Sequence, residues 1–290
     1  MKVLVTGAGG QLAAELLHTA PPEHQIVALT RRELDLTDRP AVAATLAEHR
    51  PEAVINAAAY TRVDDAEDEP ETAFAVNAEG AGSLAEEAAA LDAALIHVST
   101  DFVFGDGGGT PWRPDDSGEP LGVYGASKLE GERRVATATG GSALIVRTAW
   151  LYSRHGRNFV TAMLERMRAG KALTIVADQI GTPTWARGLA GALWRGLARG
   201  IAGLHHWTDA GVASWYDFAV AIQDEAVALG LVAQPVSIAP VPFEAYPTRA
   251  RRPAFSVLDK TATWKALEIR PAHWRHALRE MLAEMEVKVD

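Results

Sequence analysis

The chain has 290 residues, of which 48% are hydrophobic, so it is long enough for one large domain or two unequal ones. Its net charge of −9 argues against a broad nucleic-acid surface, and its lack of cysteine excludes disulfides, thiol catalysis and thiolate metal sites. The opening MKVLVTGAGG is too poor in apolar residues for a signal peptide, and no segment resembles a membrane span of ~20 apolar residues, so we expect a cytoplasmic protein without membrane contact.

Five short apolar segments in the first half predict buried strands. They are VLVT at 3–6, IVAL at 26–29, AVINAA at 53–58, ALIHVST at 94–100 and ALIVRTAW at 143–150. Helical patterns lie between them at about 11–19, 38–49, 70–91 and 124–138. This alternation predicts an α/β fold with a Rossmann-type doubly wound parallel sheet. Ligands of such sheets bind at the carboxyl ends of the strands.

The alternation loosens after about residue 150. A helix at 158–169, a strand at 173–177, a helix at 185–199, the segment GLHHWT at 203–208 and a helix near 213–229 are expected. We predict a dinucleotide-binding domain at 1–175 and mainly a smaller C-terminal substrate-binding lobe at 176–290. Elements at about 185–208 are also compatible with a return to the first domain.

Glycines follow the first predicted strand in TGAGGQL at 6–12. Gly7 and Gly10 stand where a strand-to-helix turn must let a phosphate approach the backbone. The helix that begins there offers unpaired N–H groups and a partial positive charge. The position between strand and helix therefore predicts dinucleotide binding, although a plain β-α turn is the alternative.

The second strand ends in Thr30, Arg31 and Arg32 instead of the acidic residue that binds a ribose 2′-hydroxyl. Two guanidinium groups could pair with a 2′-phosphate. We therefore predict NADPH as the preferred cofactor, with NADH possible if the arginines are only solvated loop residues. Asp35 and Leu36 are candidates to flank the adenine, and Asp35 could instead cap the helix that begins near 38.

A candidate reactive group lies between the fourth strand and the helix that follows. The strand ends in Ser99, Thr100 and Asp101, while Tyr124 and Lys128 lie four positions apart on one helix face. A nearby ammonium favours the phenolate form of a tyrosine, and a hydroxyl such as Thr100 or Ser99 can hold a carbonyl oxygen. The alternative is a purely structural Tyr–Lys pair.

These segments together resemble the extended short-chain dehydrogenase/reductases, and among them the dTDP-4-dehydrorhamnose reductase family. The likeness runs nearly end to end. It is carried by GAGGQL at 7–12, NAAAYTRVDDAE at 56–67, VNA at 76–78, STDFVF at 99–104, YGASK at 124–128, RTAWLY at 147–152, NF at 158–159, DQIGTPT at 178–184 and RPAFSVLD at 252–259. The last three lie outside the general cofactor-binding pattern and discriminate most.

The resemblance implies roles for individual residues. Tyr124 would donate the proton, Lys128 would support it and bind the nicotinamide ribose, and Thr100 would hold the sugar C4 carbonyl. The remaining cofactor contacts would be Gly7, Gly10, Gln11, Leu12, Ala57, Ala59, Tyr60 and Thr61, with Asn77 ordering the site. The remaining substrate contacts would be Asp101, Trp150, Arg252 and Ser256, and Tyr124 would touch both ligands.

The implied activity is NADPH-dependent reduction of the C4 ketone of dTDP-4-dehydro-L-rhamnose. Two alternatives stay open: a reductase or epimerase for another nucleotide 4-keto sugar, and a non-catalytic regulatory subunit of a methionine adenosyltransferase. Phe102 stands where tyrosine is frequent in the family, which leaves the preferred sugar open. We expect no resident metal, but Glu15 matches a position linked with a metal at the dimer contact of some relatives. A role for Mg²⁺ and a homodimer are therefore also open.

The charged clusters at 64–69 and 249–252 have two interpretations each. The acidic run, Asp64 to Glu69, is typical of a solvated loop and helix start. Arg249, Arg251 and Arg252 could receive the diphosphate of a nucleotide sugar or could be loop charges.

Overall fold

A parallel six-stranded sheet forms the centre of the larger part of the molecule in the computed structural model, which describes residues 1–107 and 109–285. Its strand order is β10-β5-β4-β3-β1-β2. The strands are β1 (Lys2–Thr6), β2 (Gln25–Leu29), β3 (Ala53–Asn56), β4 (Ala94–Thr100), β5 (Leu144–Thr148) and β10 (Gly203–His206). The five strands predicted for the first half of the chain are all present, and the doubly wound α/β fold is confirmed.

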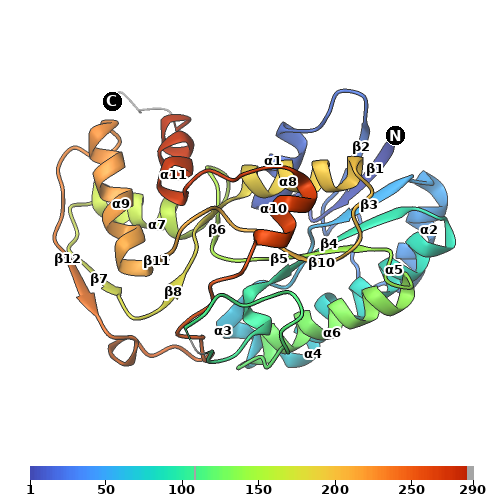
Figure 1. The fold of residues 1–290 in the computed structure, drawn as a ribbon, viewed down its shortest axis with the longest axis horizontal. Coiled ribbons are helices and arrows are strands. Elements are labelled where there is room, and N and C mark those ends of the chain that lie inside the picture. Colours follow the sequence, from blue (N-terminus) through green and yellow to red (C-terminus); the bar gives the residue numbers. More distant parts are fainter. Residues whose placement is uncertain (108, 286–290) are drawn as a thin grey trace.

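Helices cover both faces of this sheet (Figure 1). One face packs against α1 (Gln11–His18) and α8 (Ala186–Ala198), with α10 (Thr261–Leu267) beside α8. The other face packs against α2 (Arg39–His49), α5 (Ala81–Ala90) and α6 (Val123–Ala138). Because β10 and α8 come from the second half of the chain, the chain returns to the main sheet after residue 185.

A second core forms the remaining part of the molecule. It contains α7 (Phe159–Arg168), α9 (Trp215–Ala228) and α11 (Trp274–Ala283), packed around the fully buried Phe218. Three short sheets accompany these helices: β7 (Leu173–Val176) with β12 (Ile238–Val241), β8 (Ile180–Gly181) with β11 (Ala213–Ser214), and β6 (Leu151–Tyr152) with β9 (Thr184–Trp185). Since α7 and β7 belong to this core, packing does not follow the predicted boundary at 175, and the division into domains stays a prediction.

The helix predicted at 70–91 is interrupted by a wider segment. It consists of α4 (Pro70–Phe74), a π-helical segment η1 (Ala75–Gly80) and α5. π-helical turns are rare and often mark functional sites. This one carries the buried Asn77. The other short helices are α3 (Val63–Ala66), η2 (Asp101–Val103) and η3 (Phe243–Ala245).

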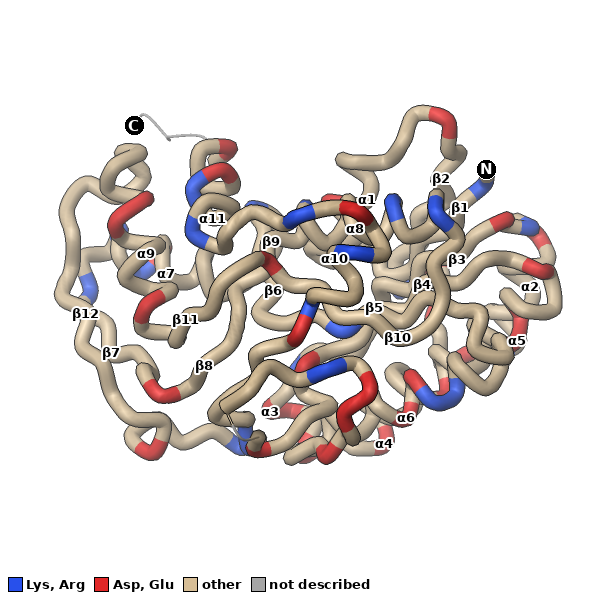
Figure 2. The backbone as a smooth tube through the Cα atoms, in the orientation of Figure 1, with Lys and Arg blue, Asp and Glu red and all other residues tan. Residues whose placement is uncertain are grey.

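Charged residues of both signs are interspersed along the chain in both parts of the molecule (Figure 2). Within residues 1–107 and 109–285, no helix is both long enough and apolar enough to cross a bilayer.

Close backbone contact fixes α6 against η1. A Cβ atom added at Gly131 would overlap the carbonyl oxygen of Asn77, which is backbone and has little freedom to move. Gly131 is therefore required by packing, whereas the exposed Gly191 in α8 has no neighbouring atom within 4 Å of an added Cβ.

We predict that Gly131→Ala lowers the free energy of unfolding by about 1–3 kcal/mol, because α6 must move away from η1. The matched variant Gly191→Ala should instead raise it by up to about 1 kcal/mol, because alanine has the higher helix propensity. Urea denaturation of both variants measures the difference. Equal stabilities would show that the contact between Gly131 and Asn77 does not constrain the helices.

Candidate active site

The glycine turn leaves a helix N-terminus open at the end of β1. Gly7 has a φ of +73°, and an added Cβ there would lie 2.8 Å from the Ala58 nitrogen. Gly10 is the N-cap of α1 and provides no capping side chain, so the N–H groups of the first turn, which begins at Gln11 and Leu12, are not capped. The turn therefore has the form that an anionic group needs for close approach.

The segment after β3 is clamped to α6 by one side chain. Asn77 accepts a hydrogen bond from the Tyr60 backbone nitrogen at 2.8 Å and donates to the Tyr60 carbonyl at 3.1 Å. Its amide nitrogen also donates to the Ser127 hydroxyl at 3.0 Å, between Tyr124 and Lys128. Asn77 thus orders the predicted cofactor segment, Ala57 to Thr61, relative to the helix that carries the predicted catalytic pair.

Thr100 and Tyr124 come together at the tip of β4. Burial raises the pKa of the Tyr124 phenol to about 12, the nearby Asp101 carboxylate adds to this, and hydrogen bonding by Thr100 opposes it. Thr100 also donates to Asp101 Oδ1 at 3.1 Å. The Tyr124 ring packs edge-on against Phe102, with 5.5 Å between the ring centroids. The phenol is therefore a protonated group beside a hydroxyl.

Lys128 lies one helical turn beyond Tyr124 and is buried. Its side-chain nitrogen Nζ lies 2.7 Å from the Val98 carbonyl oxygen and 3.3 Å from His97 Nε2. Burial lowers the pKa of Lys128 to about 8, and the Glu132 carboxylate opposes this shift. The predicted pair therefore occupies one face of α6, directed at the end of β4.

A buried ion pair attaches the same face of α6 to β5. Glu132 binds Arg147 through two contacts, at 2.9 Å to Nε and 2.7 Å to Nη2, and both side chains are almost fully buried. Glu132 also accepts a hydrogen bond from the Ser99 hydroxyl. Two contacts between a guanidinium and a carboxylate restrict their relative orientation, so the rotation of α6 about its axis is constrained.

The C-terminal segment reaches the tip of β4. Ser256 is buried, and its backbone nitrogen donates to the Ile180 carbonyl at 2.9 Å. Burial raises the pKa of Asp101 to about 6, and the hydrogen bond from the Ser256 side chain is the largest effect that opposes the rise. Arg252 pairs with Asp64 at 2.8 Å. The segments at 178–181 and 252–256 thus come close to the predicted catalytic group.

The predicted diphosphate arginines already have carboxylate partners. Arg249 pairs with Asp65 and Asp68, and Arg251 pairs with Asp106. The acidic run is therefore more than a solvated loop, because it binds the segment 249–252 across the molecule. Its Glu67 also accepts a hydrogen bond from the Val123 nitrogen at 2.8 Å, at the first turn of α6.

Trp150 has a strained backbone and a stacked partner. Its φ of +48° is rare for a bulky residue. Its ring stacks on Trp215 with 3.6 Å between centroids and an interplanar angle of 7°. Trp215 is the first residue of α9, and its role in this aromatic pair was not recognised in the sequence. The predicted contact of Trp150 with the sugar stays a prediction.

The end of β2 differs in part from expectation. Glu33 accepts hydrogen bonds from the backbone nitrogen and hydroxyl of Thr30, both at 2.8 Å. Arg31 and Arg32 are exposed, and Arg31 pairs with Asp35 at 3.3 Å.

Asp35 and Leu36, which follow β2, make contacts within the protein. The N-cap of α2 is Asp38, so the alternative that Asp35 caps this helix is wrong. Asp35 instead accepts hydrogen bonds from the backbone and hydroxyl of Thr37. Leu36 is buried in the core against Gly80. Adenine contacts at Asp35 and Leu36 stay predictions.

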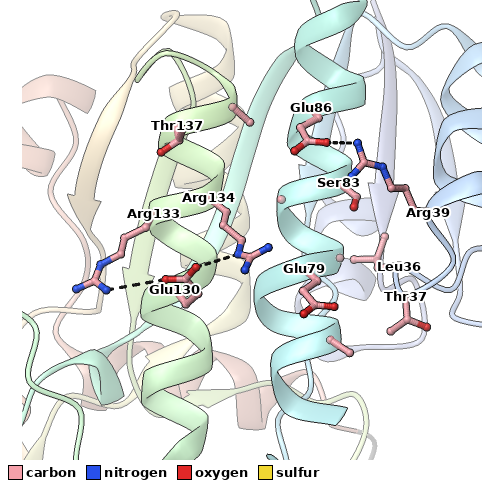
Figure 3. Close-up of a pocket in the computed structure, with 14 residues that line it drawn as sticks. Leu36, Thr37, Arg39, Glu79, Ser83, Glu86, Glu130, Arg133, Arg134 and Thr137 are labelled. Carbon is pink, nitrogen blue, oxygen red and sulfur yellow. Dashed lines mark hydrogen bonds and ion pairs between the residues drawn. The ribbon is translucent and has the colours of Figure 1, made fainter. Parts of the chain in front are cut away.

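A cavity of about 510 Å³ lies elsewhere, between α2, α5 and α6 (Figure 3). Its lining includes the ion pairs Arg39–Glu86 and Arg134–Glu130. None of the residues of the predicted catalytic group lines it. Of the predicted cofactor contacts, Leu36 lines it, and its charged walls make it a poor match to the reduction predicted here.

Glu15 is fully buried in α1 and already has a cationic partner. Arg187 Nε lies 2.9 Å from Glu15 Oε2, while His155 is 3.9 Å from Oε1. The described residues contain no group of three or more His, Asp or Glu side chains placed to hold a metal ion.

We predict that Glu132→Gln lowers the free energy of unfolding by about 3–5 kcal/mol, because it leaves the Arg147 charge buried without a partner. Glu130→Gln, two residues earlier on the partly exposed side of α6, should change it by less than about 1 kcal/mol. Urea denaturation monitored by circular dichroism measures both. A loss below about 1 kcal/mol for Glu132→Gln would contradict the anchoring role.

Comparisons with known proteins show the family of this chain. Residues 1–287 match the model of the family described as RmlD substrate binding domain. The chain is 40% identical to dTDP-4-dehydrorhamnose reductase of Aggregatibacter actinomycetemcomitans, with 98% of this chain and 99% of that protein covered. It is 42% identical to a probable dTDP-4,6-dihydroxy-2-methyloxan-3-one 4-ketoreductase of Streptomyces antibioticus, with 98% and 96% covered.

A solved structure also matches over nearly the whole chain. The crystal structure of dTDP-4-dehydrorhamnose reductase from Bacillus anthracis in complex with NADP has a TM-score of 0.93 and 32% identity, covering 98% of this chain and 99% of that one. These matches confirm the resemblance inferred from the motifs. The chain belongs to the RmlD substrate binding domain family.

Proposed function

We propose that this protein is an NADPH-dependent reductase that converts the C4 ketone of dTDP-4-dehydro-L-rhamnose into the hydroxyl of dTDP-L-rhamnose. The observation that carries the proposal is that Thr100 lies within hydrogen-bonding reach of the Tyr124 phenol at the tip of β4, while the buried Lys128, one helical turn further on, binds the Val98 carbonyl of the same strand, in a chain of this family. Relatives named dTDP-4-dehydrorhamnose reductase are about 40% identical over nearly the whole chain.

The residues at the tip of β4 have complementary tasks in this proposal. NADPH, when bound, supplies the hydride that is delivered to C4. Thr100 holds the carbonyl oxygen, and the Tyr124 phenol donates its proton to that oxygen as charge develops there. The high pKa of about 12 keeps Tyr124 protonated at neutral pH. The Lys128 ammonium then stabilises the phenolate that remains.

The site has features that suit a dinucleotide. The N-terminus of α1 offers uncapped N–H groups to a pyrophosphate, and Gly7 lets the turn before it pack directly against the backbone of Ala57 and Ala58. Arg31 and Arg32, at the end of β2, would pair with a 2′-phosphate. The Bacillus anthracis relative was solved with NADP, which supports the same choice here.

Residues from the C-terminal part complete the substrate side in this proposal. Asp101 and Ser256 would contact the sugar beside Thr100, and Trp150 would pack on the sugar ring. Arg252 would reach the diphosphate by exchanging its bond with Asp64, which is partly exposed, for a phosphate oxygen. A homodimer and a cytoplasmic location remain predictions of the sequence.

A second candidate is reduction of another dTDP-linked keto sugar. The Streptomyces antibioticus relative, named as a probable 4-ketoreductase of a different dTDP sugar, is 42% identical. Assays with a panel of nucleotide 4-keto sugars separate the two candidates. A regulatory subunit of a methionine adenosyltransferase is disfavoured because Thr100, Tyr124 and Lys128 are all present. A stoichiometric synthetase partner without reductase activity would reverse that judgement.

We predict that Tyr124→Phe lowers kcat about 100- to 10,000-fold while NADPH binding and the fold persist, because the variant loses only the acidic proton. NADPH oxidation with the dTDP keto sugar gives the rate, and fluorescence titration gives the cofactor affinity. Tyr246→Phe, an exposed tyrosine far along the chain, serves as the control and should retain full activity. Near-normal turnover in Tyr124→Phe would refute Tyr124 as the acid.

We predict that Arg32→Ala lowers kcat/KM for NADPH by about tenfold or more and leaves that for NADH nearly unchanged, since only NADPH carries the 2′-phosphate. Arg39→Ala, in which the lost side chain pairs with Glu86, should affect neither cofactor. A wild-type enzyme that clearly prefers NADH would reject the assignment of Arg31 and Arg32.

A further inference from the structure

A row of buried polar side chains crosses the sheet beneath the candidate active site. The Thr6 hydroxyl donates to Asn56 Oδ1 at 2.7 Å, and Asn56 Nδ2 lies 3.1 Å from His97 Nδ1. His97 Nε2 in turn lies 3.3 Å from Lys128 Nζ. Thr6, Asn56 and His97 come from β1, β3 and β4, and each is 1% exposed. The row therefore connects the glycine turn to the predicted catalytic lysine without access to solvent.

The orientation of the Asn56 amide follows from its neighbours. The backbone N–H of Ala58 can only donate, and it lies 3.2 Å from Asn56 Oδ1. Exchanging the oxygen and nitrogen of the amide would place two donors against each other at this position. Asn56 Oδ1 accepts hydrogen bonds from both Thr6 and Ala58, whose N–H also lies 3.3 Å from Thr6 Oγ1, and Asn56 Nδ2 donates towards His97.

This orientation determines where His97 carries its proton. Because Asn56 Nδ2 donates to Nδ1, that ring nitrogen must offer a lone pair, and the proton of the neutral ring lies on Nε2. The Nε2–H group then points at Lys128 Nζ. An ammonium has no lone pair and cannot accept this hydrogen bond, whereas a neutral amine can.

The other charged groups near Lys128 do not remove this conflict. Among the described residues, Glu132 of α6 is the one carboxylate that raises the pKa of Lys128, and it is already bound by Arg147 from β5. Asp101 of η2 acts on the Tyr124 phenol, one helical turn before Lys128, and is not among the groups that shift the pKa of Lys128. From β4, the Val98 carbonyl accepts one hydrogen bond from Nζ, which either form of the lysine can donate.

We propose that His97 is a positioning residue that, as the neutral Nε2–H tautomer, donates a hydrogen bond to the Lys128 amine and so sets the pH at which this amine takes up its proton. His97 touches neither substrate nor cofactor in this proposal and acts through Lys128 alone. The proposal deepens the proposed function, since it rests on Lys128 assisting Tyr124.

The protonation of Lys128 predicts in which direction turnover changes with pH. Burial, with the Lys128 charge as a further cause, lowers the pKa of His97 well below its ordinary value, so the ring stays neutral over the working range. The pKa of Lys128 is about 8. Below that pH the ammonium form supports proton donation by Tyr124, and turnover should fall as the pH rises through this value.

The tautomer can be observed without any turnover. Protein labelled with ¹⁵N-histidine is examined by long-range ¹H–¹⁵N correlation spectra above the Lys128 pKa of about 8, where the neutral amine is the main form, and His97→Phe identifies the signal of His97. We expect the pattern of a neutral ring protonated at Nε2. A ring protonated at Nδ1, or a doubly protonated ring, would overturn the proposal.

The variant Asn56→Asp reverses the direction of the hydrogen bond between His97 Nε2 and Lys128 Nζ. In Asn56→Asp the carboxylate accepts from His97 Nδ1–H, which leaves a lone pair on Nε2 to accept from the Lys128 ammonium. The titration midpoint of Lys128, followed with ¹³C-labelled lysine and assigned with Lys128→Arg, should rise by about one pH unit or more. Because an added carboxylate raises the midpoint by its charge alone, the same substitution is also made in the His97→Phe background.

The proposal requires that Asn56→Asp raise the Lys128 titration midpoint more in the presence of His97 than in the His97→Phe background. Equal rises of the midpoint in the two backgrounds would show that His97 does not transmit the effect of the Asn56 substitution to Lys128, and would overturn the proposal. These measurements are independent of the substrate. A protein that fails to reduce the dTDP keto sugar but shows the Nε2–H tautomer and the inverted titration would refute the proposed function and leave the hydrogen-bond assignment standing.

Discussion

The buried contact between Glu132 and Arg147 is the constraint on which the candidate active site depends. Tyr124, Lys128 and Glu132 follow one another at intervals of one helical turn, so they occupy the same face of α6. Arg147, in β5, binds the last of the three through two contacts, and Ser99, in β4, binds it as well. The other two side chains are thereby directed at the tip of β4.

Other contacts complete the frame around this face. Asn77 ties the segment after β3 to α6, and Glu67 satisfies a backbone donor at the start of that helix. Through Tyr60, Asn77 holds the segment Ala57 to Thr61, which the cofactor is proposed to contact. The structure therefore links the two halves of the proposed chemistry, cofactor binding and proton donation, through hydrogen bonds that are short in space and distant in sequence.

Much of this arrangement follows from local sequence patterns, and the rest does not. Continuous apolar runs predicted the strands, and the run at 94–100 coincides with β4. The pairs β8–β11 and β6–β9 have only two residues per strand, too few for a periodic pattern, and α10 and α11 lie in a region where no element was predicted. Their positions depend on packing between distant segments.

The site residues divide in the same way. Tyr124, Lys128 and Thr100 were recognised because their spacing has a chemical meaning. His97 and Glu132 were missed, since one resembles an ordinary strand residue and the other an ordinary surface residue of a helix. Their roles arise from partners on other strands. The arginines at 249–252 were recognised as a cluster, but their carboxylate partners at 64–68 and 106 could be known only from the fold.

The π-helical segment at 75–80 restricts insertions and deletions in this part of the chain. An α-helix turns by roughly 100° per residue, so deleting one residue from this segment would restore regular winding but rotate everything before it relative to everything after it. Asn77 and α4 could then no longer both keep their places beside Tyr60 and α6. This region should therefore accept exchanges of side chains more readily than insertions or deletions, and aligned relatives should rarely show gaps there.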